Sequence, residues 1–258
     1  MSHKIYCSVT IGIFLLISHT YDVFAQDKPP VIQIKTDSLN LFDTVRKRAI
    51  PIALYFPVHR SKTQRLKLII LSHGYYQNMP NGNKKLSYLS DFLASNGYFV
   101  ASIQHELPSD ELIPNDGVPQ IVRMPFWDRG ADNIFFVLSE LKKRNPELDY
   151  QNVTLIGHSN GGDMTALFPQ KYPNRVSRII TMDNRRMALP RTKFPKVYSL
   201  RSSDQPADQG VLPTLSEQKK FDIKIVKLTG TIHNDMDNRG TDAQQKEICG
   251  YVLRFLQD

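Results

Sequence analysis

The hydrophobic residues of this chain gather in short runs separated by polar segments. Six such runs predict β-strands, and the first of them is a continuous apolar run stopped by glycine, typical of a strand buried on both faces. The predicted strands are residues 67–74, 98–104, 153–159, 176–183, 195–202 and 221–228. Before them, residues 42–57 predict two extended pieces, the second with Ile52, Leu54 and Phe56 alternating with other residues.

Helical spacing of apolar residues fills the intervals between these strands. The predicted helices are residues 86–97, 132–143, 163–172 and 244–256. Strands that alternate with helices imply right-handed crossovers and a mainly parallel sheet covered on both faces. The fold class is therefore α/β. Residues 105–127 interrupt the alternation with many prolines and acidic side chains, and we expect an ordered excursion loop there.

The first residues follow a different pattern. A short basic start precedes an apolar stretch, and the small residues before Gln26 match the positions that a signal peptidase reads. The alternative is an uncleaved anchor, but the stretch is short for a bilayer span. We expect residues 1–25 to be a signal peptide, residues 26–258 to form one domain, and the product to be secreted or periplasmic, without stable membrane insertion.

The composition excludes some classes of protein but does not indicate a function. The 258 residues are 41% hydrophobic and 22% charged, as in ordinary soluble proteins. The formal charge of +8 attracts anionic surfaces or substrates. Because the basic residues are scattered, with no long basic run interleaved with aromatics, nucleic-acid binding is not expected. Cys7 leaves with the signal, so Cys249 has no partner for a disulfide and is expected in the core.

The motif Gly-His-Ser-Asn-Gly at 157–161 lies between a predicted strand and a predicted helix. Glycines two residues on either side of Ser159 let the backbone turn sharply, which exposes the serine hydroxyl at the carboxyl edge of the sheet. The helix N-terminus behind it offers the backbone N–H of Asn160 to a developing oxyanion. Ser159 is therefore the candidate nucleophile.

A serine nucleophile needs a base, and His233 is the only histidine after Ser159. It follows the last predicted strand by a short loop, so it also lies at the carboxyl edge, where open α/β sheets place their sites.

The third member of the triad is a carboxylate that orients the imidazole. Asp204 directly follows the strand at 195–202 and is the favoured candidate. Asp208, in the same loop, and Asp183, which ends the preceding strand, stay open as alternatives. The neighbouring Arg185 and Arg186 suggest a structural salt bridge for Asp183.

A second oxyanion donor is expected where His73 and Gly74 end the first buried strand. A glycine there lets backbone N–H groups face the site, and Tyr75 is the favoured donor, with Gly74 as the alternative. His73 is expected to orient this loop rather than to act as a base.

These motifs resemble the α/β-hydrolase superfamily: the Gly-His-Ser-Asn-Gly-Gly segment, Ser-His-Gly after a strand, and an aspartate followed by a histidine downstream. Residues 42–57 resemble the start of its dienelactone-hydrolase and platelet-activating-factor acetylhydrolase-like branch. The resemblance implies an eight-stranded sheet and hydrolysis through a covalent acyl-serine. Only about a dozen residues separate the strands at 176–183 and 195–202, which leaves no room for a large lid domain there.

Three functions fit this set of residues. The first is an esterase acting on small-molecule esters without a cofactor or metal, since Asp235 and Asp237 lack the spacing of a calcium loop. The second is a peptidase or amidase on the same triad, and the third is a catalytically silent binding protein with the hydrolase fold. Phe126 and Trp127 are candidates for the acyl pocket or for the core. Arg185, Arg186 and Arg201 lie near strand ends and stay open as candidates for selecting anionic substrates.

Overall fold

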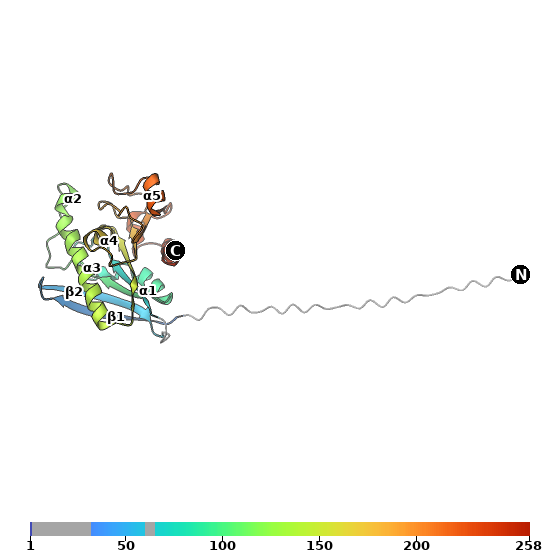
Figure 1. The fold of residues 1–258 in the computed structure, drawn as a ribbon, viewed down its shortest axis with the longest axis horizontal. Helices are drawn as coiled ribbons and strands as arrows, with labels where there is room; N and C mark the ends of the chain where they lie inside the picture. Colours follow the sequence, from blue (N-terminus) through green and yellow to red (C-terminus); the bar gives the residue numbers. More distant parts are fainter. Residues whose placement is uncertain (2–31, 60–64) are drawn as a thin grey trace. The chain divides into compact units, whose positions relative to one another are not determined.

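The alternating strands and helices build one sheet in the computed structural model, which describes residue 1, residues 32–59 and residues 65–258. Its eight strands lie in the order β1-β2-β4-β3-β5-β6-β7-β8. Figure 1 shows the ribbon, with β1 and β2 labelled. They are β1 (Ile34–Asp43), β2 (Arg48–Pro57), β3 (Lys67–Ser72), β4 (Phe99–Ile103), β5 (Asp149–His158), β6 (Arg178–Met182), β7 (Lys196–Arg201) and β8 (Lys224–Lys227). The pairs β1–β2 and β2–β4 are antiparallel and the other pairs parallel, so the α/β fold class is confirmed.

Six α-helices and two 3₁₀ turns connect the described strands. They are η1 (Gly82–Lys84), α1 (Ser87–Ser95), α2 (Pro119–Val122), α3 (Met124–Arg144), α4 (Asn160–Lys171), α5 (Leu215–Phe221), η2 (His233–Met236) and α6 (Asp242–Gln257). The described residues from 32 onward belong to one compact unit. Apart from residue 1, the predicted signal peptide lies outside the described residues, as does its boundary at Gln26.

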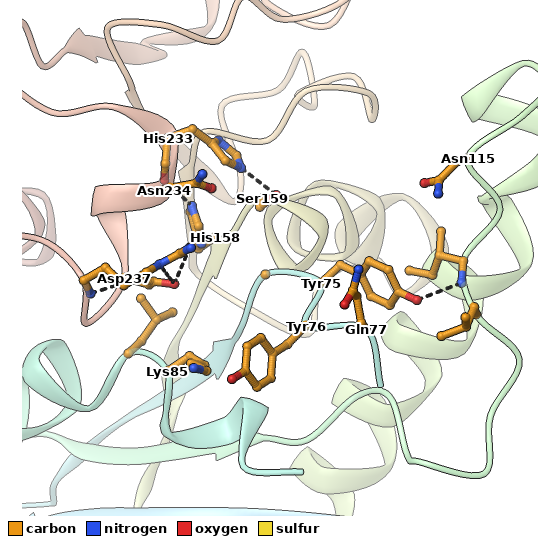
Figure 2. Close-up of a pocket in the computed structure, with 15 residues that line it drawn as sticks. Tyr75, Tyr76, Gln77, Lys85, Asn115, His158, Ser159, His233, Asn234 and Asp237 are labelled. Atoms are coloured by element: carbon orange, nitrogen blue, oxygen red, sulfur yellow. Dashed lines mark hydrogen bonds and ion pairs between the residues drawn. The ribbon is translucent and has the colours of Figure 1, made fainter. Parts of the chain in front are cut away.

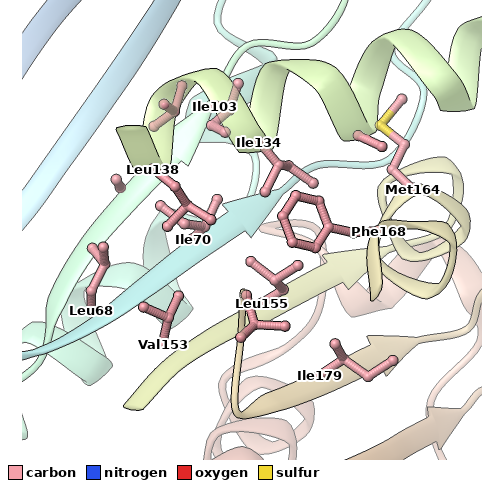
Figure 3. Packing of buried hydrophobic residues seen from close by; sticks show 14 of the residues in the cluster. Leu68, Ile70, Ile103, Ile134, Leu138, Val153, Leu155, Met164, Phe168 and Ile179 are labelled. Atoms are coloured by element: carbon pink, nitrogen blue, oxygen red, sulfur yellow. The ribbon is translucent and has the colours of Figure 1, made fainter. Parts of the chain in front are cut away.

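The period-two alternation along β3 divides the core into two layers. Leu68 and Ile70 point to the face covered by α3 and α4, whereas Ile69 and Leu71 point to the face covered by α1 and α6. Figure 3 shows the first layer, with Phe168 of α4 and Ile134 of α3 against the sheet. Because every parallel strand runs the same way, the loops that follow β3, β5, β6, β7 and β8 meet at one edge of the sheet.

The predicted elements are confirmed with three differences. The two extended pieces expected within residues 42–57 are a turn and β2, because β1 lies at Ile34–Asp43, almost wholly before that segment. The excursion at 105–127 is not a loop throughout, because it contains α2 and the first turn of α3. Both helices begin with a proline in the first turn, where a missing N–H costs nothing. The sequence analysis also missed α5, an exposed helix whose capping box between Thr214 and Glu217 is a signal that could have predicted it.

The loop between β6 and β7 spans residues 183–195 and carries no helix, so no large lid lies there. Among the described residues, no helix combines the length and apolar character required to cross a bilayer.

Asp163 fastens the start of this β6–β7 loop to α4. Its Oδ1 accepts the backbone N–H of Arg186 at 3.0 Å and that of Met187 at 2.9 Å. Only 3% of Asp163 is exposed, and burial raises the pKa of its carboxyl to about 6. Since the folded protein holds its proton more tightly than the unfolded chain, ionisation of Asp163 opposes folding.

We therefore expect Asp163→Asn to change how stability depends on pH. Between about pH 4 and pH 6 the unfolded wild-type chain ionises Asp163 while the folded chain keeps the proton, so this group's contribution is lost as the pH rises. Asparagine keeps the Oδ1 acceptor and has no such loss. The free energy of unfolding of both proteins is measured in urea at pH 4, 5, 6 and 7. The difference between the variant and the wild type should rise by about 3 kcal/mol across this range, with the variant becoming relatively more stable. Parallel curves for the two proteins would contradict the assignment.

Candidate active site

Ser159 lies at the turn between the end of β5 and the start of α4, with φ 52° and ψ −120°. This left-handed backbone conformation is strained for a serine and is held by close packing on both sides. A Cβ at Gly157 would lie 2.2 Å from the carbonyl oxygen of Gly161. A Cβ at Gly161 would lie 2.4 Å from the carbonyl oxygens of Ser72 and His73. The two glycines of the motif are therefore required by space, as the sequence predicted from the sharp turn.

His233, the first residue of η2, faces this serine. Its Nε2 lies 3.0 Å from Ser159 Oγ (Figure 2). The ring packs against that of His158, with ring centroids 4.9 Å apart. The structure thus brings together the predicted nucleophile and the predicted base, which are 74 residues apart in the chain.

The carboxylate on the other side of the imidazole is Asp183. Its Oδ2 lies 2.5 Å from His233 Nδ1, so the ring donates from Nδ1 to Asp183 and accepts at Nε2. The sequence analysis favoured Asp204 for this contact, and that expectation is corrected. Asp183 directly follows β6, the strand next to β5 in the sheet, and this adjacency carries it to His233.

Asp204 and Asp208 make other contacts. Asp204 Oδ1 accepts the backbone N–H of His233 at 2.7 Å, so it holds the segment that carries the base rather than the ring. Asp208 Oδ2 accepts from Gln120 Nε2 at 3.0 Å, and its own N–H donates to the carbonyl of Arg185. Neither carboxylate is hydrogen-bonded to the imidazole.

Asp183 is fully buried and well partnered. Burial alone would raise its pKa, but the hydrogen bonds from His233 and Ser202 and the charge of Arg201 outweigh it and hold the pKa below the usual value. Arg201 Nη2 lies 2.9 Å from Asp183 Oδ1, and Ser202 Oγ donates to Oδ2 at 2.7 Å. The salt bridge that the sequence suggested for Asp183 thus comes from Arg201 and not from Arg185 or Arg186. An ionised carboxylate here can stabilise a positively charged imidazole.

His158 is a buried neighbour of the pair. Burial first, and then the charge of His233, lower its pKa to about 4, so the ring is neutral at pH 7. Its Nε2 lies 3.1 Å from the carbonyl oxygen of His233 and donates to it. His158 therefore holds the backbone of the base without competing for its proton.

The turn after β3 approaches Ser159 from the opposite side. A Cβ at Gly74 would lie 3.0 Å from His158 Nδ1 and 3.2 Å from Ser159 Cβ, so a larger residue would have to push these side chains aside. His73 Nδ1 donates to the carbonyl oxygen of Gly74 at 2.6 Å, while its Nε2 accepts from the backbone of His105 at 3.2 Å. In a trans peptide the C=O and the next N–H point in opposite directions, so this bond fixes where the N–H of Tyr75 points. His73 orients the loop, as the sequence predicted.

The side chain of Asn160 is locked by two groups that the sequence analysis did not connect to the site. Asn160 Oδ1 accepts from Trp127 Nε1 at 2.8 Å, and Asn160 Nδ2 donates to Glu106 Oε1 at 3.0 Å. Glu106 is 1% exposed, and burial raises its pKa. A glutamate three residues after the end of β4 was the only signal for this contact, and no pattern tied it to Asn160.

A cavity of about 380 Å³ opens beside Ser159 and His233. The excursion at 105–127 supplies Leu112, Ile113 and Asn115 to its wall, as Figure 2 shows for Asn115. Phe126 and Trp127 do not line this cavity and belong to the buried side chains. The excursion therefore forms part of the pocket with other residues than those considered from the sequence.

The rest of the cavity wall includes charged and aromatic side chains. Asp237 and Arg239 pair with each other, with Arg239 Nη2 2.8 Å from Asp237 Oδ2, and Lys85 Nζ lies 3.7 Å from the ring centre of Tyr76. Within the described part of the chain, no group of three or more His, Cys, Asp or Glu side chains is arranged to hold a metal ion.

Comparison with solved structures finds this architecture in esterases. The structure of the esterase Est22 has a TM-score of 0.63 and 13% identity, covering 87% of this chain and 81% of that chain. The esterase Est2 of Thermogutta terrifontis, in a butyrate-bound structure, has a TM-score of 0.61 and 12% identity, covering 88% and 94%. A Klebsiella pneumoniae protein assigned as a dienelactone hydrolase has a TM-score of 0.59 and 13% identity, covering 88% and 99%.

No family model matches the chain, and no curated protein matches it in sequence. At these low identities the likeness to solved structures concerns the fold. The strand order, the turn at Ser159 and these structural neighbours together identify the chain as a protein of the α/β-hydrolase fold.

Proposed function

We propose that this protein is a serine hydrolase that cleaves carboxylic esters through an acyl-serine intermediate. The observation that carries the proposal is the line of contacts from Asp183 through His233 to Ser159, at 2.5 Å and 3.0 Å, at the mouth of a cavity. Carboxylate, imidazole and hydroxyl in this order are what activates a serine as a nucleophile. The esterases among the structural neighbours favour an ester over an amide bond.

Acylation uses each of these contacts. Ser159 Oγ attacks the carbonyl carbon of the ester while His233 Nε2 takes the hydroxyl proton. Asp183 keeps the Nδ1 proton on the ring and stabilises the imidazolium without being protonated itself. His233 then gives its proton to the departing alcohol oxygen, which leaves the acyl group on Ser159.

Deacylation repeats these steps with water. His233 removes a proton from a water molecule, the hydroxide adds to the acyl carbon, and Ser159 leaves with the proton returned from His233. In both tetrahedral intermediates the backbone N–H groups of Asn160 and Tyr75 hold the oxyanion. The fixed peptide after Gly74 and the locked side chain of Asn160 support this assignment, because donors that do not need to reorganise stabilise charge best.

The size of the cavity points to small or moderately sized esters. About 380 Å³ lies at the lower end of the range for ligand pockets. The short β6–β7 loop offers no large lid to cover a long acyl chain, and one structural neighbour was solved with butyrate.

The apolar stretch before Gln26 leads us to propose that the protein is exported and cleaved after Ala25. Sequencing the amino terminus of protein recovered from the periplasm or medium of a secreting host should give Gln26 as the first residue. A product that keeps Met1 or stays with the cytoplasmic fraction would rule the proposal out.

The esterase proposal is tested with p-nitrophenyl butyrate and the full chain. Removing the nucleophile in Ser159→Ala, or the base in His233→Ala, should lower kcat by at least about a thousandfold with the circular dichroism spectrum unchanged. Ser95→Ala, on the exposed end of α1, serves as the matched control and should retain full turnover.

A fluorophosphonate should label Ser159 in the wild-type protein. The absence of both turnover and labelling would instead support a catalytically silent binding protein. Faster cleavage of a p-nitroanilide than of the matched p-nitrophenyl ester would point to an amidase.

Replacing each of two carboxylates by its amide tests which of them orients His233. Asp183→Asn should lower kcat by about three to four orders of magnitude, because the amide cannot hold the required tautomer of His233. Asp204→Asn keeps an oxygen that can accept the backbone N–H of His233, so kcat should fall less than about tenfold. A larger loss of kcat in Asp204→Asn than in Asp183→Asn would show that Asp204 is the acid of the triad.

A further inference from the structure

Three arginines that the catalytic contacts do not use lie on two segments that neighbour α4. Arg185 and Arg186 follow Asp183 in the β6–β7 loop, and Arg123 lies at the junction of α2 and α3. Gln120 of α2 joins the two segments, since its Nε2 donates to Asp208, whose N–H in turn donates to the carbonyl of Arg185 at 2.9 Å. We call Arg123, Arg185 and Arg186 the arginine cluster.

Hydrogen bonds between α2 and the β6–β7 loop bring the three arginines into one region. Partial burial and then the positive charge of Arg186 lower the pKa of Arg123, while the charge of Asp163 acts in the opposite direction. Half-buried like charges destabilise the folded protein unless something of opposite charge offsets them.

Within the described chain, the positive charges of these three arginines are only partly compensated by negative charges. None of the three arginines forms an ion pair within 4.0 Å of a carboxylate, although most other buried or half-buried arginines of this end of the sheet do so. The guanidinium of Arg185 donates to Gln205, and the Nε atoms of Arg185 and Arg186 are buried without a hydrogen-bond partner, as are those of Arg48 and Arg178. The cluster lacks a paired carboxylate among the described residues, which leaves its guanidinium charges available to an anionic group.

Arg201 differs from the cluster in this respect. It pairs with Asp183 and donates to the carbonyl oxygen of Asn184 at 2.5 Å. Its positive charge is therefore already compensated by the carboxylate of Asp183. The sequence analysis grouped Arg201 with Arg185 and Arg186 as possible selectors of anionic substrates. The structure removes Arg201 from that group and adds Arg123.

Two carboxylates near the cluster, Asp163 and Asp208, set its net charge. Both already accept hydrogen bonds, Asp163 from backbone N–H groups and Asp208 from Gln120. Three positive and two negative charges leave about one positive charge. This balance suits a singly charged carboxylate better than a doubly charged phosphate, and the planar guanidinium fork matches carboxylate geometry.

The cluster is connected to the reacting serine through short contacts. The N–H of Arg186 donates to Asp163, whose own N–H donates to the carbonyl of Ser159 at 3.0 Å. None of the three arginines lines the cavity itself, which is lined by Ser159 and Tyr75 among others. The arginine cluster therefore neighbours the turn of the nucleophile through α4, and an ester bound at Ser159 has to extend beyond the cavity to reach it.

We propose that the arginine cluster binds a carboxylate carried by the substrate and thereby selects anionic esters. This inference rests on the proposed esterase function and names its substrate class. The ester is bound through its carboxylate by Arg123, Arg185 and Arg186 while its carbonyl carbon faces Ser159.

Two matched pairs of esters test the proposal, one with the charge on the acyl side and one with it on the alcohol side. Mono-p-nitrophenyl glutarate is compared with p-nitrophenyl 5-methylhexanoate, and 4-acetoxybenzoate with 4-acetoxybenzamide. In wild-type protein the ratio of kcat/KM for the anionic over the neutral ester should be about tenfold or more in at least one pair. Arg123→Gln or Arg186→Gln should reduce that ratio by about tenfold to a hundredfold, as expected for the loss of a charged hydrogen bond.

Two further variants sharpen the comparison. Arg186→Lys keeps the charge but loses the planar fork, so it should reduce the ratio less than Arg186→Gln. Arg175→Gln, an exposed arginine on the connection from α4 to β6 at the opposite edge of the sheet, is the control and should keep the wild-type ratio.

A binding measurement separates this proposal from the esterase proposal. Sodium glutarate should raise the melting temperature of the wild-type protein more than sodium chloride at equal ionic strength, and this difference should vanish in Arg123→Gln/Arg186→Gln. Glutarate binding without any turnover would leave the anion site standing and overturn the esterase. The arginine cluster would be overturned as a binding site by two results together. These are turnover with the same anionic-to-neutral ratio of kcat/KM in wild type and variants, and no stabilisation by glutarate.

Discussion

The candidate site depends on the close approach of α4 to the end of β3. Gly161 touches the backbone carbonyls of Ser72 and His73 so closely that any side chain would collide with them. This contact holds the first turn of α4 over the neighbouring strand and fixes Ser159 in its strained conformation. It also brings the turn at Gly74 against the serine. One steric constraint therefore positions the hydroxyl and both backbone segments that surround it.

Buried electrostatics add orientation to this steric frame. Asp183 is removed from water, which is costly for a carboxylate unless its oxygens are satisfied. Arg201, Ser202 and His233 satisfy them, and together they keep the group ionised despite its burial. Removal of any one partner would leave a buried charge poorly compensated. The same contacts that stabilise the loops after β6 and β7 thus set the tautomer of the imidazole.

Cationic groups lie in two places around the serine. The wall of the cavity carries Lys85 besides Asp237 and Arg239, which pair with each other. The arginine cluster lies outside the cavity, on segments that contact α4, and makes no ion pair among the described residues. A substrate with a carboxylate would compensate the guanidinium charges, whereas a neutral ester would not. The selectivity of such an enzyme would come from loop residues, on a sheet shared with many other hydrolases.

The sequence by itself determined the features that are encoded over short stretches of chain. Apolar runs predicted the strands, and the glycines around Ser159 predicted the turn, because both signals depend on neighbouring residues alone. His233 followed from being the last histidine of the chain. Only the tertiary structure decided among the carboxylates, since the choice of Asp183 over Asp204 depends on which strand ends are neighbours and where each side chain points. The pairing of Arg201 and the lock on Asn160 join segments distant in sequence, and no local pattern records such contacts.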